Sequence, residues 1–241
     1  VLVFGIFGVL NPNFVSAYSL QNLLTEISPL ILLAGGLSFI IFTGGIDLGA
    51  GAMVSATCVI SGLYVSRFGN GIIPVMLVIG IFLGLLNGVI VTKLKIPSFI
   101  VTLCTQNLWA FIALYFCPNG SVAVGMDFRK QIAWMTDKVC GIPIIFIVAL
   151  LVLLVLYVFQ QYTSSGRSIF AVGANIRAAR LAGVNTDRAQ IMAFVVSGAC
   201  SSLAGALYAY KQKSAVPTIG DALTLSAIAS IALGGTSMAG G

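Results

Sequence analysis

Few side chains in this sequence could carry out bond-making chemistry, and their types exclude most enzyme classes. The chain has no histidine, so a histidine-based triad, a histidine metal site and a histidine proton switch are ruled out. No glycine-rich phosphate loop followed by Lys-Ser or Lys-Thr occurs, and no paired carboxylates lie within an apolar run. We therefore expect no catalytic residue, no metal site and no bound cofactor, and any ATP hydrolysis must take place on another polypeptide.

The cysteines read as structural residues. Their spacing matches no metal-binding pattern. Cys58, Cys104 and Cys200 lie within apolar runs, where a cysteine behaves as a small buried hydrophobic residue. Cys117 and Cys140 flank one polar loop and could pair if that loop faces an oxidising compartment. Their pairing stays open.

A different kind of chemistry, the binding of a neutral polar solute, needs amides, hydroxyls and aromatic faces. Side chains of these types lie within apolar runs, at Asn87, Thr102, Gln106, Asn107 and Trp109. Gln106 and Asn107 are the strongest candidates, because adjacent amides deep in an apolar run are unusual. For each of the five, the alternative is a hydrogen bond between helices or packing against lipid.

The composition places these side chains in a membrane. The chain has 241 residues, of which 59% are hydrophobic and 7% charged, whereas soluble domains carry roughly 25% charged residues. The formal charge is +6, from 12 Lys and Arg against six Asp and Glu. These charges are too few and too scattered for nucleic-acid binding, and basic residues flanking membrane spans explain them better.

The elements that position the polar residues are predicted to be membrane-spanning helices. A helix needs about 20 apolar residues to cross the hydrocarbon layer. Charge-free windows of this kind occur at 27–46, 48–66, 72–92, 96–117, 142–160, 189–210 and 222–241, and residues 1–10 resemble the tail of a further span. We therefore expect an all-α, polytopic bundle forming a single transmembrane domain over 1–241. About eight spans are visible, the first partial, and the chain looks truncated at both ends, because Val1 is not a methionine and Gly241 falls within a motif.

The charge count alone does not orient this bundle. If successive spans cross the membrane in opposite directions, the loops 93–97 and 161–188 lie on the same side of it. Each side of the membrane then carries six Lys and Arg residues in total. The positive-inside rule is therefore tied. We orient the chain by the arginines concentrated in 161–188, which we take as the cytoplasmic side.

One long apolar tract is interrupted at Asp47. Forty helical residues over 27–66 would measure about 60 Å, twice the hydrocarbon thickness, so the chain must reverse near Gly44 and Gly45. Asp47 can cap the following helix; the alternative is an unwound segment lining a solute path. The tract 222–241 ends similarly, at Gly234 and Gly235, which indicates weakly an internal repeat with hinge glycines at both places.

The arginine-rich loop 161–188 is predicted to contain a two-turn helix. Asn175 suits its N-cap, Arg177, Arg180 and Leu181 are good helix formers, and Gly183 suits the left-handed position that follows. Thr186 or Asp187 is then expected to cap the next membrane helix. A helix so short must pack on something, either its own membrane domain or another protein; the alternative is a basic amphipathic segment that lies on anionic lipid headgroups.

Three stretches in order resemble permease subunits of ABC importers for simple sugars, the ribose, galactose and xylose group. The first, residues 43–48, is close to that group's Gly-Gly-Ile-Asp-Leu-Ser signature. The second runs from Gly84 through 95–103 (Lys-Ile-Pro-Ser-Phe-Ile-Val-Thr-Leu). The third spans 173–185 and is followed by 227–229 (Ala-Ile-Ala) and 233–237 (Leu-Gly-Gly-Thr-Ser). Each motif alone is weak, but the resemblance covers nearly the whole chain.

This resemblance implies a multi-pass permease of about ten helices in a bacterial-type inner membrane, working as a pair with a second copy or a paralogue. It also implies ATPase subunits that bind ATP on the cytoplasmic side and an external sugar-binding protein. Residues 173–185 would then form the coupling loop that docks on the ATPase. The leading expectation is thus a monosaccharide permease subunit that alternates access and is not itself an enzyme. The alternatives are a permease for nucleosides or branched-chain amino acids, or a self-contained channel or secondary transporter.

Overall fold

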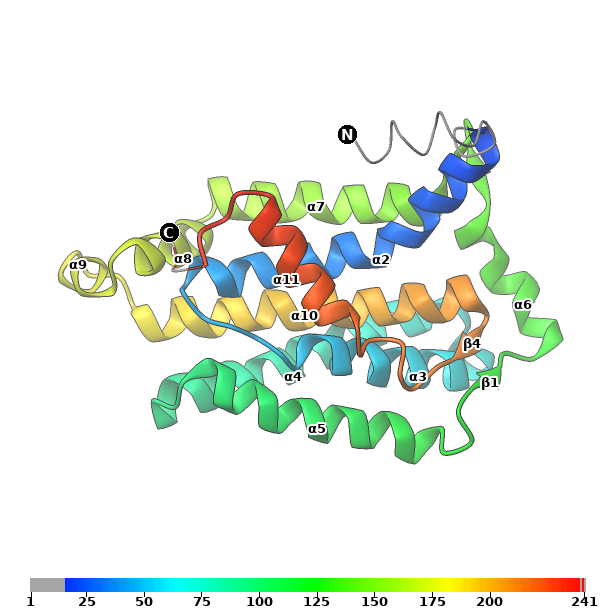
Figure 1. Cartoon of the computed structure of the whole chain (residues 1–241), viewed down its shortest axis with the longest axis horizontal. Coiled ribbons are helices and arrows are strands. Elements are labelled where there is room, and N and C mark those ends of the chain that lie inside the picture. The colour runs from blue at the N-terminus through cyan, green and yellow to red at the C-terminus, as the bar shows by residue number, and fades with distance from the viewer. Residues whose placement is uncertain (1–15, 239, 241) are drawn as a thin grey trace.

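The computed structural model describes residues 16–238 and 240 as a bundle of helices (Figure 1). Its long helices are α2 (Ala17–Phe42), α3 (Ala50–Phe68), α4 (Ile72–Leu94), α5 (Ser98–Phe116), α7 (Ile144–Tyr162) and α10 (Thr186–Gln212). The shorter ones are α6 (Met126–Ala133), α8 (Ser164–Ala174), α9 (Ile176–Leu181) and α11 (Leu223–Leu233), with 3-10 turns at Gly69–Gly71 and Trp134–Thr136. The all-α expectation is confirmed. Residues 1–10, predicted as part of a span, lie outside the described residues.

Five stretches of the described residues are long and apolar enough to cross a membrane: Ala17–Phe42, Ala50–Leu94, Ser98–Phe116, Ile144–Tyr162 and Thr186–Gln212. The second, 45 residues long, contains both α3 and α4. The chain reverses between these two helices at Gly69, whose φ is +54°. The predicted windows therefore find the helices of the bundle, with differences at their ends.

The first helix begins ten residues before its predicted window. Residues 17–26 precede the predicted window 27–46, but Ser16 caps the helix by accepting a hydrogen bond from the amide of Ser19. Glu26 lies inside α2 and is paired with Lys211 of α10 at 2.5 Å. Because Glu26 is paired with Lys211, its charge is compatible with a position inside α2.

The predicted window 222–241 is too long for its helix. The helix α11 ends at Leu233 after 11 residues, about 16 Å and half of the hydrocarbon thickness. Gly235 follows with φ +91°, a left-handed conformation that ends a helix. In Figure 1 this helix crosses α2 and α10 obliquely rather than running parallel to them.

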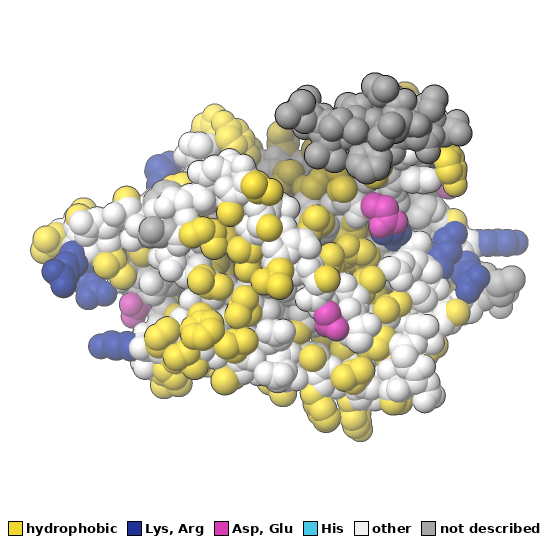
Figure 2. All heavy atoms as spheres, in the orientation of Figure 1, with side chains coloured by type: hydrophobic (Ala, Val, Ile, Leu, Met, Phe, Trp, Pro, Cys, Tyr) yellow, Lys and Arg dark blue, Asp and Glu magenta, His cyan; other side chains and the backbone are white. Residues whose placement is uncertain are grey.

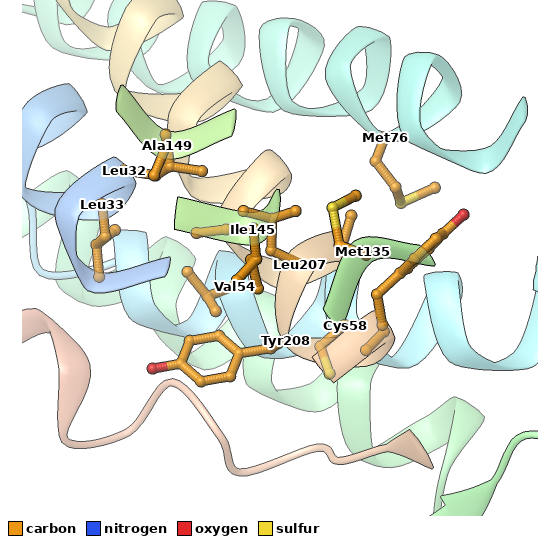
Figure 3. Close-up of a cluster of buried hydrophobic side chains, with 14 of the residues drawn as sticks. Leu32, Leu33, Val54, Cys58, Met76, Met135, Ile145, Ala149, Leu207 and Tyr208 are labelled. Atoms are coloured by element: carbon orange, nitrogen blue, oxygen red, sulfur yellow. The ribbon is translucent and has the colours of Figure 1, made fainter. Parts of the chain in front are cut away.

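The core is organised around α10, which packs against α2, α3 and α4. Its close approach to α4 depends on Gly198, where a Cβ would lie only 2.3 Å from the carbonyl oxygen of Gly80. Small residues at such contacts let helix backbones approach closely in membranes. Apolar side chains also pack around α10: Leu33 of α2, Val54 of α3 and Leu207 of α10 belong to one buried cluster (Figure 3).

The bundle has two polar ends separated by an apolar middle. In Figure 2, Lys and Arg side chains gather at both ends of the molecule, and hydrophobic side chains cover much of the surface between them. Two short antiparallel pairs, β1 (Val122–Ala123) with β4 (Ser214–Ala215) and β2 (Lys138–Val139) with β3 (Ile142–Pro143), complete the fold. In Figure 1, β1, β4 and α6 lie at the end opposite α9.

The cysteines are all free thiols, and their burial follows the prediction except at one position. Cys58 and Cys200 are buried, whereas Cys104 is exposed on α5, so its place in a buried core was predicted wrongly. A charge-free run shows only that a residue lies at membrane depth, and both buried and lipid-facing positions occur there. Cys117 is buried and Cys140 exposed, and the two form no disulfide.

Candidate functional site

The interruption between α2 and α3 is an extended segment, residues 43–49, clamped against α5. The helix α2 ends at Phe42, and Gly44 turns the chain with φ +75°. The amide of Ile46 then donates to Ser98 Oγ at 3.0 Å, and the amide of Leu48 donates to Thr102 Oγ1 at 3.1 Å. Hydroxyl groups at the start of α5 therefore satisfy backbone groups that a break in a membrane helix would leave unpaired.

Asp47 turns inward from this segment and is 3% exposed. Its Oδ1 accepts from the amide of Gly49 at 2.8 Å, and the hydroxyl of Ser197 lies 3.4 Å from its Oδ2 as a donor. The N-cap position of α3 belongs to Gly49, so Asp47 satisfies an amide at the helix start from two residues earlier rather than standing at the cap itself. The carboxylate joins the break to α10.

The predicted solute-binding side chains do not form one cavity. Thr102 and Asp47 both hold the segment 43–49 in place. Asn107 lies on the exposed face of α5 and donates to the carbonyl oxygen of Leu103 at 3.0 Å, and Gln106 beside it is half-buried. Residues that are close together in the sequence thus have different surroundings: Thr102 holds the segment 43–49, whereas Asn107 lies on an outward-facing surface.

Asn87 and Trp109 are buried polar residues with unpaired atoms. Asn87 is 1% exposed, and among the described residues neither its Nδ2 nor its Oδ1 has a hydrogen-bond partner; the same holds for Nε1 of Trp109. Native proteins pair nearly all buried polar groups. These two side chains therefore retain unused hydrogen-bonding capacity inside the bundle.

The arginine-rich loop forms the short helix that its residues predict. Asn175 Oδ1 accepts from the amides of Arg177 and Ala178, each at 3.0 Å, and Gly183 follows with φ +82°. Leu181 is 90% exposed, so α9 presents an apolar side chain to its surroundings at a basic end of the bundle. Both ends of this helix are confirmed.

A hydrogen bond connects α9 to the membrane helix that follows it. Arg180 Nη2 donates to Thr186 Oγ1 at 3.0 Å. Between α9, the segment 43–45 and the α4–α5 turn lies a cavity of about 570 Å³, lined mostly by polar residues and by Lys95, Arg180 and Asp187. The short helix therefore borders the same hollow as the break in the membrane helices.

The two glycine-interrupted segments meet at this place. A Cβ on Gly240 would lie 3.1 Å from the amide nitrogen of Gly44 and 3.1 Å from the carbonyl oxygen of Gly173. Gly44 and Gly45 thus lie at the first interruption, and Gly234 and Gly235 end α11 at the second. The hinge role of these four glycines stays a prediction.

Two features of the loop were not predicted correctly. The helix α8 precedes α9 and was not expected; Thr163 caps it by accepting from the amide of Gly166, a Thr-Ser-Ser-Gly signal that could have been recognised. The cap of α10 is Asn185, whose Oδ1 accepts from the amide of Arg188 at 3.0 Å, and not Thr186 or Asp187. Thr186 is the first helical residue, and its hydroxyl accepts from Arg180 instead.

Apolar helices long enough to span a bilayer, a break between two of them and an exposed basic helix together define a polytopic helical membrane protein. A family described as "Branched-chain amino acid transport system / permease component" matches residues 19–241. The ribose import permease protein RbsC of Bacillus subtilis is 35% identical over 98% of this chain and 74% of its own length, and that of Haemophilus influenzae is 34% identical over 100% and 76%. The autoinducer 2 import system permease protein LsrC of Photorhabdus luminescens is 32% identical over 99% and 72%. No solved structure matches.

The chain therefore belongs to the family of ABC-importer permease components that includes the ribose import permeases. It is a multi-pass protein of the bacterial inner membrane. As a permease component it is not itself an enzyme and carries no cofactor, and ATP is bound by the ATPase with which such a component works. Membership of an ABC importer implies ATPase and solute-binding partners.

Proposed function

We propose that this chain is the membrane-spanning subunit of an ATP-driven importer for a monosaccharide-like solute, and that a separate ATPase drives its alternating access. The observation that carries this proposal is the helix α9, capped at both ends and bonded to α10 through Arg180 and Thr186. The similarity to ribose import permeases supports a sugar as the solute. The similarity to LsrC leaves a solute of the autoinducer 2 kind as the alternative within this class.

In this proposal the loop 161–188 is the cytoplasmic coupling loop, and α9 docks on the ATPase. Leu181 is 90% and Ile176 43% exposed, and Arg177 lies between them on the same short helix. Apolar side chains exposed together with arginines are typical of protein interfaces. A helix of six residues is marginal alone in water, so its two caps and the Arg180 bond keep it preformed for docking.

A second permease copy, or a paralogue, is proposed to cover the outer face of α5. This helix packs mainly on α3, and Phe99, Leu108 and Phe111 are exposed on it together with Asn107. A polar amide facing lipid at membrane depth is costly, whereas one facing a partner across a solute path is useful. Gln106 and Asn107 would then contact the solute between two copies, and Asn87, Thr102, Trp109 and Asp47 would line or support the path.

The whole chain is proposed to form one permease domain over 1–241 on a ten-span plan. In this plan, α11 would belong to an interrupted span. Gly44, Gly45, Gly234 and Gly235 would be the hinges at which these interrupted spans flex. A solute-binding protein would dock at the end opposite α9, where β1, β4 and α6 lie.

The first experiment is co-purification of the tagged chain from its native membrane, followed by an ATPase assay with candidate solutes and their binding protein. We expect an ATPase subunit to co-purify and its activity to rise with a loaded sugar-binding protein. Stimulation by branched-chain amino acids or nucleosides instead would move the substrate class to those permeases. Solute flux by this chain alone in ATP-free liposomes would favour a channel or a secondary transporter.

A further inference from the structure

A polar hollow lies beside the loop 161–188, separate from the cavity under α9. It measures about 400 Å³ and is formed between the start of α8 and the start of α10. Serine hydroxyls line it on one side, at Ser164, Ser165 and Ser168, and Arg188 lines it on the other. Its inner wall is apolar and includes Met192.

The charge in this hollow is not neutralised by the protein. Among the described residues, Glu26 and Lys211 form the one ion pair, and the Arg188 guanidinium and the Ser165 hydroxyl make no hydrogen bond. Arginine prefers bidentate recognition of carboxylate or phosphate oxygens. The hollow therefore offers a cation and a hydroxyl donor to an anionic group that comes from outside the chain.

A second, apolar groove lies farther along α10, toward the C-terminal end of that helix. It also measures about 400 Å³ and is walled by α7 on one side and α10 on the other. Leu151 and Val155 of α7 are 57% and 63% exposed, so the groove opens toward the surrounding lipid. Its walls hold no charged residue, in contrast to the hollow.

The hollow and the groove lie on one stripe of α10. Arg188 and Met192 line the hollow, and Val196, Ala199 and Leu203 line the groove. Spacings of three and four residues place all five on the same helix face. The 15-residue rise from the first to the last is about 22 Å, close to the depth of one leaflet with its headgroup, about 21 Å.

We propose that this stripe binds one anionic phospholipid from the leaflet on the α9 side. The phosphate and headgroup contact Arg188 and the Ser165 hydroxyl, and an acyl chain lies in the groove between α7 and α10. Along α10, the polar hollow and the apolar groove follow each other in the same order as the headgroup and the acyl chain of a phospholipid in that leaflet. Their separation also matches that of the two parts of the lipid. The assignment to the cytoplasmic leaflet rests on the proposed function, but the binding itself requires no ATPase and no solute.

Native mass spectrometry of the purified full chain, released from detergent micelles that contain phosphatidylglycerol and phosphatidylethanolamine, tests the proposal. One charge near the membrane surface contributes about 1 kcal/mol, so Arg188→Gln should lower the preference for phosphatidylglycerol about fivefold. Arg167→Gln is the matched control, because Arg167 lies on α8 outside the hollow and donates to the carbonyl oxygen of Gln161. Ala199→Phe fills the groove without touching Arg188 and should reduce retention of both lipids.

An equal loss of preference in Arg188→Gln and Arg167→Gln would show that general surface charge attracts lipid, and would overturn the site. Displacement of phosphatidylglycerol by millimolar inorganic phosphate or glycerol phosphate would overturn it as well, because the acyl groove would then contribute nothing. Unchanged retention of both lipids in Ala199→Phe would overturn the site for the same reason. Each variant is compared at an unchanged elution volume and melting temperature, so that misfolding is not read as lost binding.

Discussion

Arg180 Nη2 donates to Thr186 Oγ1 across 3.0 Å, which joins the exposed helix α9 to the first turn of α10. The helix α10 is also where Ser197 meets Asp47 of the break between α2 and α3. A displacement of α9 therefore reaches the break through one helix and two side-chain contacts. In the proposed function, a docked ATPase would act on the membrane helices through these contacts.

Removing either partner of the Arg180 bond should loosen α9 to a similar extent. A side-chain hydrogen bond contributes about 1 kcal/mol, so Arg180→Ala and Thr186→Val should each raise amide hydrogen exchange in α9 about fivefold. Exchange measured by mass spectrometry on the purified chain checks this. Arg177→Ala serves as the control, because no hydrogen bond of its side chain to a described residue is found; exchange rising equally in all three variants would contradict the role of the bond.

Loss of the Asn175 cap should unfold α9 locally. Asn175→Ala removes the acceptor of two amides, a loss of about 1 kcal/mol for a helix that is marginal already. A spin label at Leu181 should report faster motion in Asn175→Ala and restored order in Asn175→Asp. The matched change Asn185→Ala removes the cap of the long helix α10 and should leave the mobility at Leu181 nearly unchanged. Similar mobility in the two alanine variants would count against a special dependence of α9 on its cap.

Asp47 is expected to matter through its acceptor oxygens more than through its charge. Asp47→Asn keeps an acceptor for the amide of Gly49 and should have a mild effect. Asp47→Leu leaves that buried amide unpaired and should destabilise the protein by about 1–3 kcal/mol. Thermal unfolding in detergent separates the two; a large loss in Asp47→Asn would show that the negative charge itself is required.

Gly198 should tolerate no side chain. A Cβ there would lie 2.3 Å from the carbonyl oxygen of Gly80 and 2.9 Å from Gly84 Cα, so Gly198→Ala forces α4 and α10 apart at about 1–3 kcal/mol. The melting temperature should fall by several degrees. Gly71→Ala, where nothing lies within 4 Å of the added Cβ, should leave it nearly unchanged, and a similar drop in both variants would disprove close packing at Gly198.

Local signals in the sequence predicted local structure well. Asn175 and Gly183 mark the two ends of α9 because capping depends on residues within one turn. The start of α2 was missed because its helix continues past Glu26, whose partner Lys211 is 185 residues away in the chain. The length of α11 was overestimated because an apolar composition does not reveal where Gly235 adopts a positive φ.

The surroundings of the candidate solute-path residues could not be predicted from the sequence. Asn87, Thr102 and Asn107 share one property in the sequence, a polar side chain in an apolar run. The structure divides them among a buried site, a clamp for the break and an outward face. Which face of a helix is covered depends on its neighbours, and for α5 we propose that the neighbour is another chain.

The position of α9 relative to the membrane can be measured at Leu181, because its side chain is 90% exposed. Leu181→Cys in a background lacking the exposed thiols of Cys104 and Cys140 is treated with a membrane-impermeant maleimide in inverted and right-side-out vesicles. If α9 faces the cytoplasm and binds the ATPase, the cysteine should be labelled in inverted vesicles alone and protected when the ATPase subunit is bound. Labelling from the outside of sealed right-side-out vesicles would rule out ATP-driven coupling through α9, because no ATPase could then reach it.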